Sequence, residues 1–249
     1  MNNIHAPLFL KGSADIGLVM FVHGFMGSPR QFDKLAGVAH RLGYSVAVLL
    51  LPGHGGSAKD FGAGTFERWQ NHVDSEVERF SRDYKNIWLF GHSMGGLLAV
   101  NAAVKYSDNI RGLFLLASPF KIILISAHAV KVRLQLIFFR RNSPMKAAYL
   151  DGTSVKLTPN LLWHIFKPLA ELNKLMKATR ANLPNVRPPV TAVYSTSDEL
   201  VSFHSLGILK SGLAGVGFEH FVLTDSLHAY YTEHEFSIIE RAFIKMIAQ

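Results

Sequence analysis

A serine between two glycines could give this chain covalent chemistry. The segment Gly91-His-Ser-Met-Gly95 follows a short apolar run at 87–90 and precedes a helix-like segment. In a G-x-S-x-G turn between a strand and a helix, the serine is strained and its hydroxyl is presented at the end of the strand. The flanking positions must be small, and Gly91 and Gly95 meet that need. The five residues alone also fit an ordinary βα loop, but in this context they make Ser93 the candidate nucleophile.

A serine hydroxyl reacts well only when a base takes its proton and a carboxylate orients that base. Both partners are expected in loops at the carboxyl ends of later strands, where ligands bind in open α/β sheets. Asp198 follows the predicted strand 190–195, and His228 follows the predicted strand 217–223. We therefore predict Ser93 as the nucleophile, His228 as the base and Asp198 as the acid that orients it.

Other polar residues near these loops compete for the same roles. Asp225 lies three residues before His228 and is the alternative acid, although ordering of its own loop is the favoured role. Glu199 is expected to point to solvent. His54 and Ser57 are expected to be exposed polar residues near the site, in a loop whose shape is set by its glycines.

A tetrahedral oxyanion needs preorganised N–H donors. One is expected from the amide of Met94, directly after the nucleophile. The other is expected from the amide of Phe25, in the loop that follows the first long apolar strand. In that loop Gly24 allows a tight turn, and His23 is expected to hold the loop by hydrogen bonds rather than to catalyse.

With these residues in this order, the chain resembles the α/β-hydrolase superfamily, and in particular monoacylglycerol lipases and small bacterial carboxylesterases. The loop Leu51-Pro-Gly-His-Gly-Gly-Ser57 adds to the match. The resemblance implies an α/β-hydrolase fold, ester hydrolysis through an acyl-enzyme and a helical cap. Relatives with an aspartate nucleophile are disfavoured by Ser93. Thioesterases, amidases and peptidases share the serine triad and stay open as alternatives, as does a non-catalytic binding protein.

The elements that must position these residues alternate along the chain. Strands are predicted at 8–10, 18–22, 44–50, 87–90, 112–117, 190–195 and 217–223, and helices at 29–42, 65–83, 94–106, 202–212 and 230–248. This alternation predicts a mostly parallel central sheet with helices on both faces. The rhythm stops at Ser118-Pro119 and resumes after Pro189. We therefore predict a core formed by 1–118 and 189–249, and a helical cap (lid) inserted at 119–188.

Composition excludes several classes of protein. The chain has 249 residues, of which 49% are hydrophobic and 18% charged, so it is not a disordered chain. It has no cysteine, which excludes thiol nucleophiles and disulfides. A membrane-spanning helix needs about 20 consecutive apolar residues, and the sequence contains no apolar run of that length. We predict no metal and no cofactor, since the histidines are scattered and H-E-x-x-H is absent. With no signal peptide recognised at the N-terminus, we expect a cytoplasmic protein.

Positive charge is concentrated in the predicted cap. The chain carries a net charge of +8, whereas 120–188 alone holds twelve Lys/Arg against two acids, a net charge of 12 − 2 = +10. We expect the apolar face of this segment to form an acyl pocket for a small lipophilic ester. The basic outer face is then the candidate for peripheral contact with anionic lipid. Nucleic-acid binding is not expected, because no recognised module is present. The sequence predicts no oligomeric state.

Overall fold

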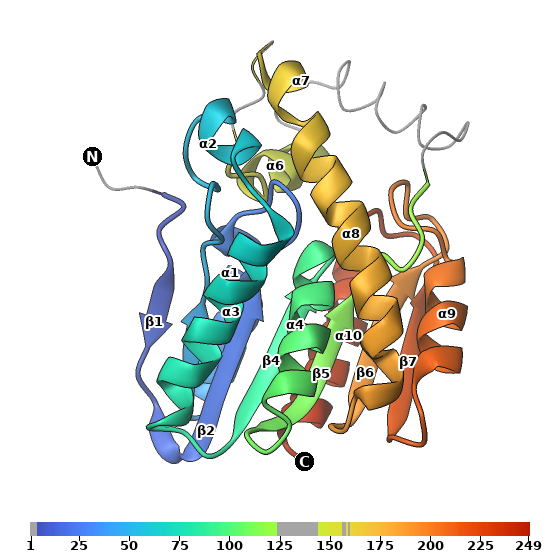
Figure 1. Ribbon diagram of the computed structural model, residues 1–249. Helices are drawn as coiled ribbons and strands as arrows, with labels where there is room; N and C mark the ends of the chain where they lie inside the picture. Colours follow the sequence, from blue (N-terminus) through green and yellow to red (C-terminus); the bar gives the residue numbers. More distant parts are fainter. Residues whose placement is uncertain (1–3, 124–143, 156–157, 159) are drawn as a thin grey trace.

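A computed structural model describes residues 4–123, 144–155, 158 and 160–249 of the chain. They form a seven-stranded sheet with the order β1-β3-β2-β4-β5-β6-β7 (Figure 1). Strand β1 is antiparallel to β3, and every other pair of neighbours is parallel. The strands are β1 (Leu8–Leu10), β2 (Ser13–Val22), β3 (Tyr44–Val48), β4 (Ile87–His92), β5 (Ile110–Leu116), β6 (Val190–Ser195) and β7 (Phe218–Leu223).

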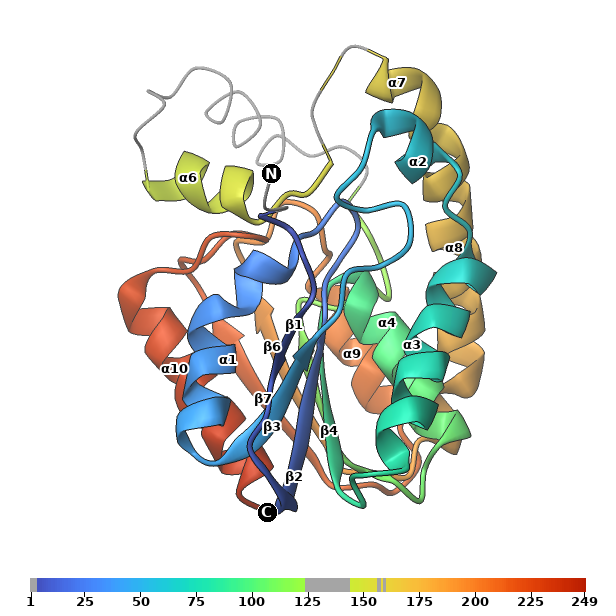
Figure 2. The same ribbon diagram turned by 90° about the vertical axis from the view of Figure 1, so that its left-hand side faces the viewer.

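Helices cover both faces of this sheet (Figures 1 and 2). They are α1 (Asp33–Arg41), α2 (Ala58–Gly62), α3 (Phe66–Ser81), α4 (Met94–Lys105), α6 (Pro144–Asp151), α7 (Leu161–His164), α8 (Phe166–Asn182), α9 (His204–Gly212) and α10 (Glu233–Ile247), with short 3-10 turns at Pro29–Phe32 and Leu183–Asn185. Helices α3, α4, α8 and α9 lie on one face, and α1 and α10 on the other. Within the described ranges no helix combines the length and apolarity needed to cross a bilayer.

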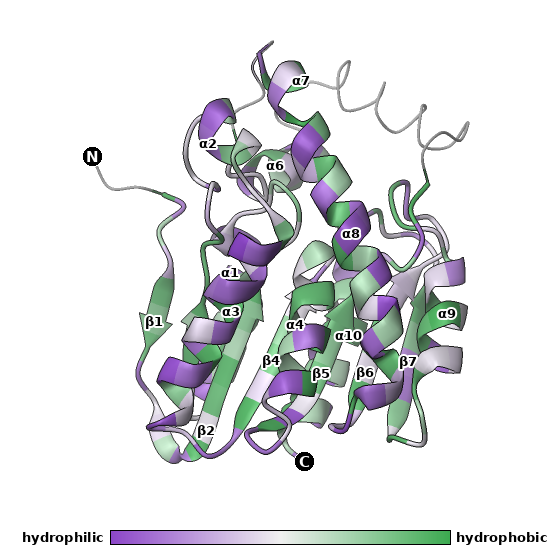
Figure 3. Ribbon diagram, in the orientation of Figure 1, coloured by the Kyte–Doolittle hydropathy of each residue, from purple (hydrophilic) through white to green (hydrophobic). Residues whose placement is uncertain are grey.

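Strand β2 shows how the sheet separates two hydrophobic cores. Leu18, Met20 and Val22 pack into the core on the face of α3 and α4, while Val19 and Phe21 pack into the core beneath α1 and α10. Successive side chains of a strand point to opposite faces, and all five are fully buried. A strand covered on both faces therefore reads as a continuous apolar run, which is why the strands are coloured mainly hydrophobic in Figure 3.

The predicted fold class is confirmed, with differences at element boundaries. The helix predicted from residue 29 begins as the 3-10 turn Pro29–Phe32, and its α-helical part starts at Asp33. Helix α2 was not predicted, because its five residues are too few to show a helical period. It begins with a capping box, in which Ser57 and Asp60 exchange hydrogen bonds between side chain and main chain.

The predicted insertion at 119–188 divides into two parts. Helices α6 and α7 lie above the carboxyl ends of the strands, α7 beside α2 and α6 beside the turn Pro29–Phe32 (Figure 2). Helix α8 instead runs along the sheet face beside α4, where Leu172, Leu175 and Met176 are buried in the main core. The last helix of the predicted cap thus supports the core. Residues 124–143 of the predicted basic cap lie outside the described residues, as does Lys156.

Candidate active site

Ser93 forms the turn between β4 and α4 by itself. Strand β4 ends at His92 and α4 begins at Met94, so the chain reverses over one residue. The backbone of Ser93 has φ 53° and ψ −125°, a conformation that costs free energy in a residue other than glycine. Hydrogen bonds hold it there: its N–H donates to the carbonyl of Leu116 at 2.8 Å, and its carbonyl accepts the N–H of Gly96 at 2.9 Å.

Glycines around this turn leave room that no side chain could share. A Cβ at Gly91 would collide with the backbone at the start of α4, and one at Gly95 would collide with the carbonyl of Val22. A Cβ at Gly24 would lie 2.8 Å from the Cβ of Ser93. The loop that follows β2 is therefore in direct contact with the serine.

Ser93, His228 and Asp198 lie in one hydrogen-bonded row, although they come from three distant loops. The Nε2 of His228 is 3.0 Å from the Oγ of Ser93, and its Nδ1 is 2.8 Å from Oδ2 of Asp198. All three residues are buried. Since an ionised carboxylate only accepts, Nδ1 carries the proton and Nε2 is free to accept one from the serine hydroxyl.

Charge and burial act in opposite directions on the His228–Asp198 pair. Burial by itself lowers the pKa of His228, but the Asp198 carboxylate beside it outweighs this effect, and the pKa lies above the ordinary 6.5. Burial by itself raises the pKa of Asp198. The neighbouring His228 and the amides of Leu200 and Val201 lower this pKa by more than burial raises it, so the net effect is a lowering. These amides donate to Oδ1 of Asp198 at 2.8 and 2.7 Å.

The alternative acid, Asp225, takes no part in this row. Its side chain is exposed, and its backbone N–H donates to Glu235 of α10 at 3.1 Å. Glu235 also receives the N–H of Thr224 at 2.6 Å and the hydroxyl of Ser226 at 2.5 Å. A carboxylate of α10 therefore shapes the loop that leads to His228.

Glu199 does not point to solvent, so that prediction is wrong. Only 2% of the residue is exposed. Its Oε2 accepts the backbone N–H of His228 at 2.9 Å, and its Oε1 accepts the hydroxyl of Tyr149 from α6. The physical reason is long-range: donors from the histidine loop and from the inserted segment both converge on this carboxylate, and neither donor is local to it in sequence.

His23 ties the loop after β2 to the chain beyond β3. Its Nε2 accepts the N–H of Leu51 at 3.0 Å, and its Nδ1–H donates to the carbonyl of Gly24 at 3.0 Å. Burial keeps its pKa well below the ordinary value, so the ring is neutral. His54 packs edge-on against His23 at 4.7 Å and is buried, contrary to its predicted exposure, because Phe61 of the unpredicted α2 covers it.

The amides of Phe25 and Met94 are unoccupied donors near the serine. Across the described residues, neither N–H donates a hydrogen bond to another protein group. Met94 lies in the first turn of α4, where amides have no partner within the helix. Phe25 follows Gly24, which is in contact with Ser93.

Comparison with known proteins places the chain in a family. The model of Hydrolase_4, described as serine aminopeptidase S33, matches residues 13–233. The chain belongs to this family. It is 27% identical over 239 residues to a thermostable monoacylglycerol lipase of Bacillus sp. (strain H-257). The aligned region covers 95% of this chain and 92% of that protein.

Lipolytic enzymes are among the solved structures that share this fold. One, from work on the metagenome-derived enzymes LipS and LipT, has a TM-score of 0.76 at 23% identity and covers 98% of this chain and 97% of its own. The monoacylglycerol lipase of Paleococcus ferrophilus has a TM-score of 0.70 at 18% identity and covers 98% of each chain. The Hydrolase_4 chain thus shares the α/β-hydrolase fold with these enzymes.

His92 is a site residue of this Hydrolase_4 protein that sequence reasoning missed. It occupies a variable position of the serine motif, so no sequence signal marked it. Its Nε2–H donates to the carbonyl of His228 at 3.0 Å, and Nδ1 has no partner among the described residues. Burial, helped by the neighbouring His228, lowers its pKa to about 3, so the ring is neutral.

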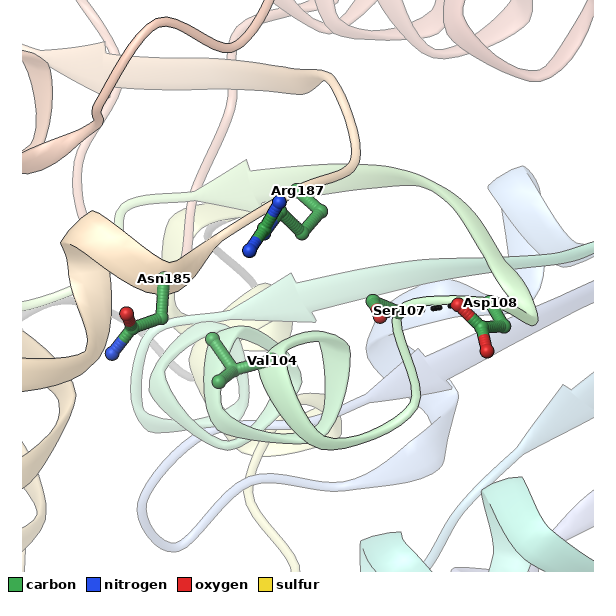
Figure 4. A pocket seen from close by; sticks show the side chains of 5 residues that line it. All are labelled: Val104, Ser107, Asp108, Asn185 and Arg187. Carbon is green, nitrogen blue, oxygen red and sulfur yellow. Dashed lines mark hydrogen bonds between the residues drawn. The ribbon is translucent and has the colours of Figure 1, made fainter.

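A pocket of about 520 Å³ lies near the amino ends of β5 and β6 (Figure 4). It is lined by Val104, Ser107, Asp108, Asn185 and Arg187. These residues precede β5 and β6, at the amino ends of the parallel strands, whereas the Hydrolase_4 serine follows the carboxyl end of β4. The pocket therefore belongs to a different part of the molecule from the candidate active site.

Proposed function

We propose that this Hydrolase_4 protein cleaves carboxylic esters through an acyl-enzyme formed on Ser93. The observation that carries the proposal is the row from Ser93 through His228 to Asp198, with separations of 3.0 and 2.8 Å. A strained serine beside a base that is itself oriented by a carboxylate is the arrangement that activates a hydroxyl for attack.

The reaction follows from which groups can donate and accept. Nε2 of His228 takes the proton of Ser93 as Oγ attacks the ester carbonyl, and the Asp198 carboxylate stabilises the imidazolium that forms. The N–H groups of Phe25 and Met94 hold the oxyanion. His228 then protonates the leaving alcohol. Water, activated by the same histidine, releases the acid and restores the serine, so the chemistry needs no cofactor.

The substrate we propose is a small lipophilic ester, such as a monoacylglycerol or another ester of a medium-to-long acyl chain. Two observations support it. One relative that matches nearly the whole chain is a monoacylglycerol lipase. The second is the contact of Tyr149 in α6 with Glu199 beside the proposed acid, and we propose that α6 and α7 act as the cap that shelters the acyl chain.

We further propose that the tip formed by α7 and the start of α8 contacts an anionic lipid surface. Leu162, Trp163 and Phe166 are 67%, 83% and 69% exposed there. Lys167 follows them directly, in a segment with a net charge of +10. Apolar side chains beside cations favour an interface with negatively charged lipid.

Hydrolysis of an ester series from C2 to C16, including monoacylglycerols, by wild type and Ser93→Ala tests this function. We expect activity that peaks at C8 or longer and is lost in the variant. Activity confined to acetyl and butyryl esters would contradict the proposed acyl pocket.

Matched thioester and amide substrates test the other reactions open to this site. The amide substrate is included because the family is described as serine aminopeptidase, an enzyme class that cleaves amide bonds. Faster turnover of an amide or thioester than of the matching ester would replace the ester proposal. A Ser93-dependent reaction with a fluorophosphonate, together with no turnover of any of these substrates, would leave an activated serine with a different substrate class.

A further inference from the structure

Glu199 is a buried carboxylate that the proposed reaction does not use. It follows Asp198 directly, and both of its oxygens accept hydrogen bonds: one from the backbone N–H of His228 at 2.9 Å, the other from the hydroxyl of Tyr149. Two accepting oxygens are what an ionised carboxylate provides. Burying such a group without donors is costly, so these two contacts are needed for Glu199 to lie where it does.

The segment that contains Tyr149 is also bonded to the loop after β2, which contains the proposed oxyanion amide of Phe25. A few residues later, the N–H of Ser154 donates to the carbonyl of Met26 at 2.9 Å, and its hydroxyl donates to the carbonyl of Gly27 at 2.5 Å. Those carbonyls lie in the loop of the proposed oxyanion amide. Helix α6 and the turn after it therefore contact both the oxyanion loop and, through Glu199, the loop of the base.

We propose that Glu199 and Tyr149 are positioning residues, through which helix α6 holds the main chain of His228 and sets the place of its imidazole against Ser93. This inference rests on the proposed function, because it concerns the base of that reaction. The backbone of His228 is held at both ends, since its carbonyl accepts His92 Nε2–H at 3.0 Å. A displacement of about 1 Å in a reacting group costs a large factor in rate, so these bonds bear directly on turnover.

Glu199 also contributes charge. Several titratable or polar groups face His228. Its ring faces Ser93 and Asp198, and its main chain is bonded to Glu199, to His92 of β4 and to Tyr231. Tyr149 of α6 is connected to it through Glu199. Burial lowers the pKa of His228, while the negative charges of Asp198 and then Glu199 raise it. Loss of the Glu199 charge therefore favours the neutral imidazole.

Glu199→Gln tests the charge with little change in shape. The new amide oxygen can accept the His228 N–H, and its NH₂ can donate to the Tyr149 oxygen. We expect the acidic limb of the kcat/KM profile to move to lower pH, since the base loses a neighbouring negative charge. Asp225→Asn is the matched control: it removes one exposed charge from the loop of His228 itself and should leave the limb in place. An unmoved limb in Glu199→Gln would overturn the inference.

Tyr149→Phe tests the link to α6 without altering charge. We expect kcat to fall about three- to tenfold with KM within about twofold, because the base is displaced while the substrate site is kept. If both residues act through one contact, the double variant Glu199→Ala/Tyr149→Phe loses less than the product of the two single losses, because Glu199→Ala already removes the contact with Tyr149. Losses that multiply independently would contradict the link.

An NMR titration of the His228 imidazole separates this inference from the proposed function. The resonance is assigned by its absence in His228→Gln, and the measurement needs no substrate. A lower midpoint in Glu199→Gln supports the charge effect even in a protein that cleaves no ester. An unchanged midpoint overturns it even if the esterase assay succeeds.

Discussion

Both the ring and the main chain of His228 form hydrogen bonds with residues that are distant in sequence. Its ring is bonded to Ser93 and Asp198, its N–H to Glu199, and its carbonyl to His92. Two segments of the chain, at 92–93 and 198–199, therefore determine where one imidazole lies. At the scale of single residues, these contacts orient the imidazole ring and determine which of its nitrogens carries the proton.

The choice between two acids is decided by the contacts of this ring. Asp198→Asn places an amide where the carboxylate accepts the Nδ1 proton, so we expect kcat to fall by on the order of 10⁴, the loss typical of a serine triad with the wrong tautomer. Asp225→Asn should keep kcat within about twofold, since exposed changes away from a site have small effects. Ester kinetics of both variants check this, and a larger loss in Asp225→Asn would reverse the assignment of the acid.

At the scale of elements, the serine turn depends on close backbone approach. Gly95→Ala forces a methyl group against the carbonyl of Val22, so we expect a loss of about 1–3 kcal/mol in the free energy of unfolding. Gly207→Ala in the middle of α9 is the control, because nothing lies within 4 Å of its Cβ. It should stabilise the protein by about 0.5–1 kcal/mol. Urea unfolding measures both, and equal effects would contradict the packing argument.

Helix α10 shapes the histidine loop through Glu235. Burial raises the pKa of Glu235, but bonds from Ser226, Thr224 and Asp225 lower it more, so its folded-state pKa lies below 4.5. A depressed carboxyl pKa stabilises the fold above the unfolded-state value, and that contribution is lost as pH falls through the folded-state value. Glu235→Gln should therefore be destabilised at pH 7, by about 1–3 kcal/mol, and approach wild type in acid.

Chemical unfolding of the two proteins between pH 7 and pH 3 checks this pH dependence. Glu240→Gln, on the same helix, is the control and should follow wild type at every pH. A difference between Glu235→Gln and wild type that stayed constant with pH would show that the carboxylate charge does not stabilise the loop.

At the scale of the whole molecule, exposed apolar groups collect at one end. The tip of α7 and α8 lies above the carboxyl ends of the strands, on the same side of the sheet as Ser93 (Figure 1). A surface that meets lipid there would bring the active site close to its proposed substrate. At the opposite end the described residues include a smaller apolar pair, Ile16 and Leu42, which are 40% and 46% exposed.

Vesicle binding tests this orientation. We expect the wild type to bind phosphatidylglycerol vesicles more tightly than phosphatidylcholine vesicles, with the difference reduced by salt. Trp163→Ser should weaken binding about tenfold, because a large apolar side chain no longer leaves water. Leu42→Ser, at the far end, should bind like wild type. Equal binding to both vesicles, or equal losses in both variants, would contradict the proposed lipid face.

The sequence by itself determined the class of sheet, the serine turn and the order of the three candidate catalytic residues. These follow from local rules: β2 and β4 are apolar runs because both of their faces are covered, and Gly91 and Gly95 flank Ser93 because the turn admits no larger side chain. The same rules located the strands before Asp198 and His228. Short-range geometry imposes such patterns, so they can be read without knowing any long-range contact.

Only the tertiary structure decided what supports the site. Glu199 lies beside Asp198 in sequence, yet it turns inward because Tyr149, 50 residues away, and the His228 amide supply its donors. His92 acts on a carbonyl 136 residues away, and α8 joins the core although its segment is predicted as a cap. Burial of a polar group depends on partners brought together by the whole fold. No local pattern of residue types encodes those partners, so they emerge only when the chain is packed.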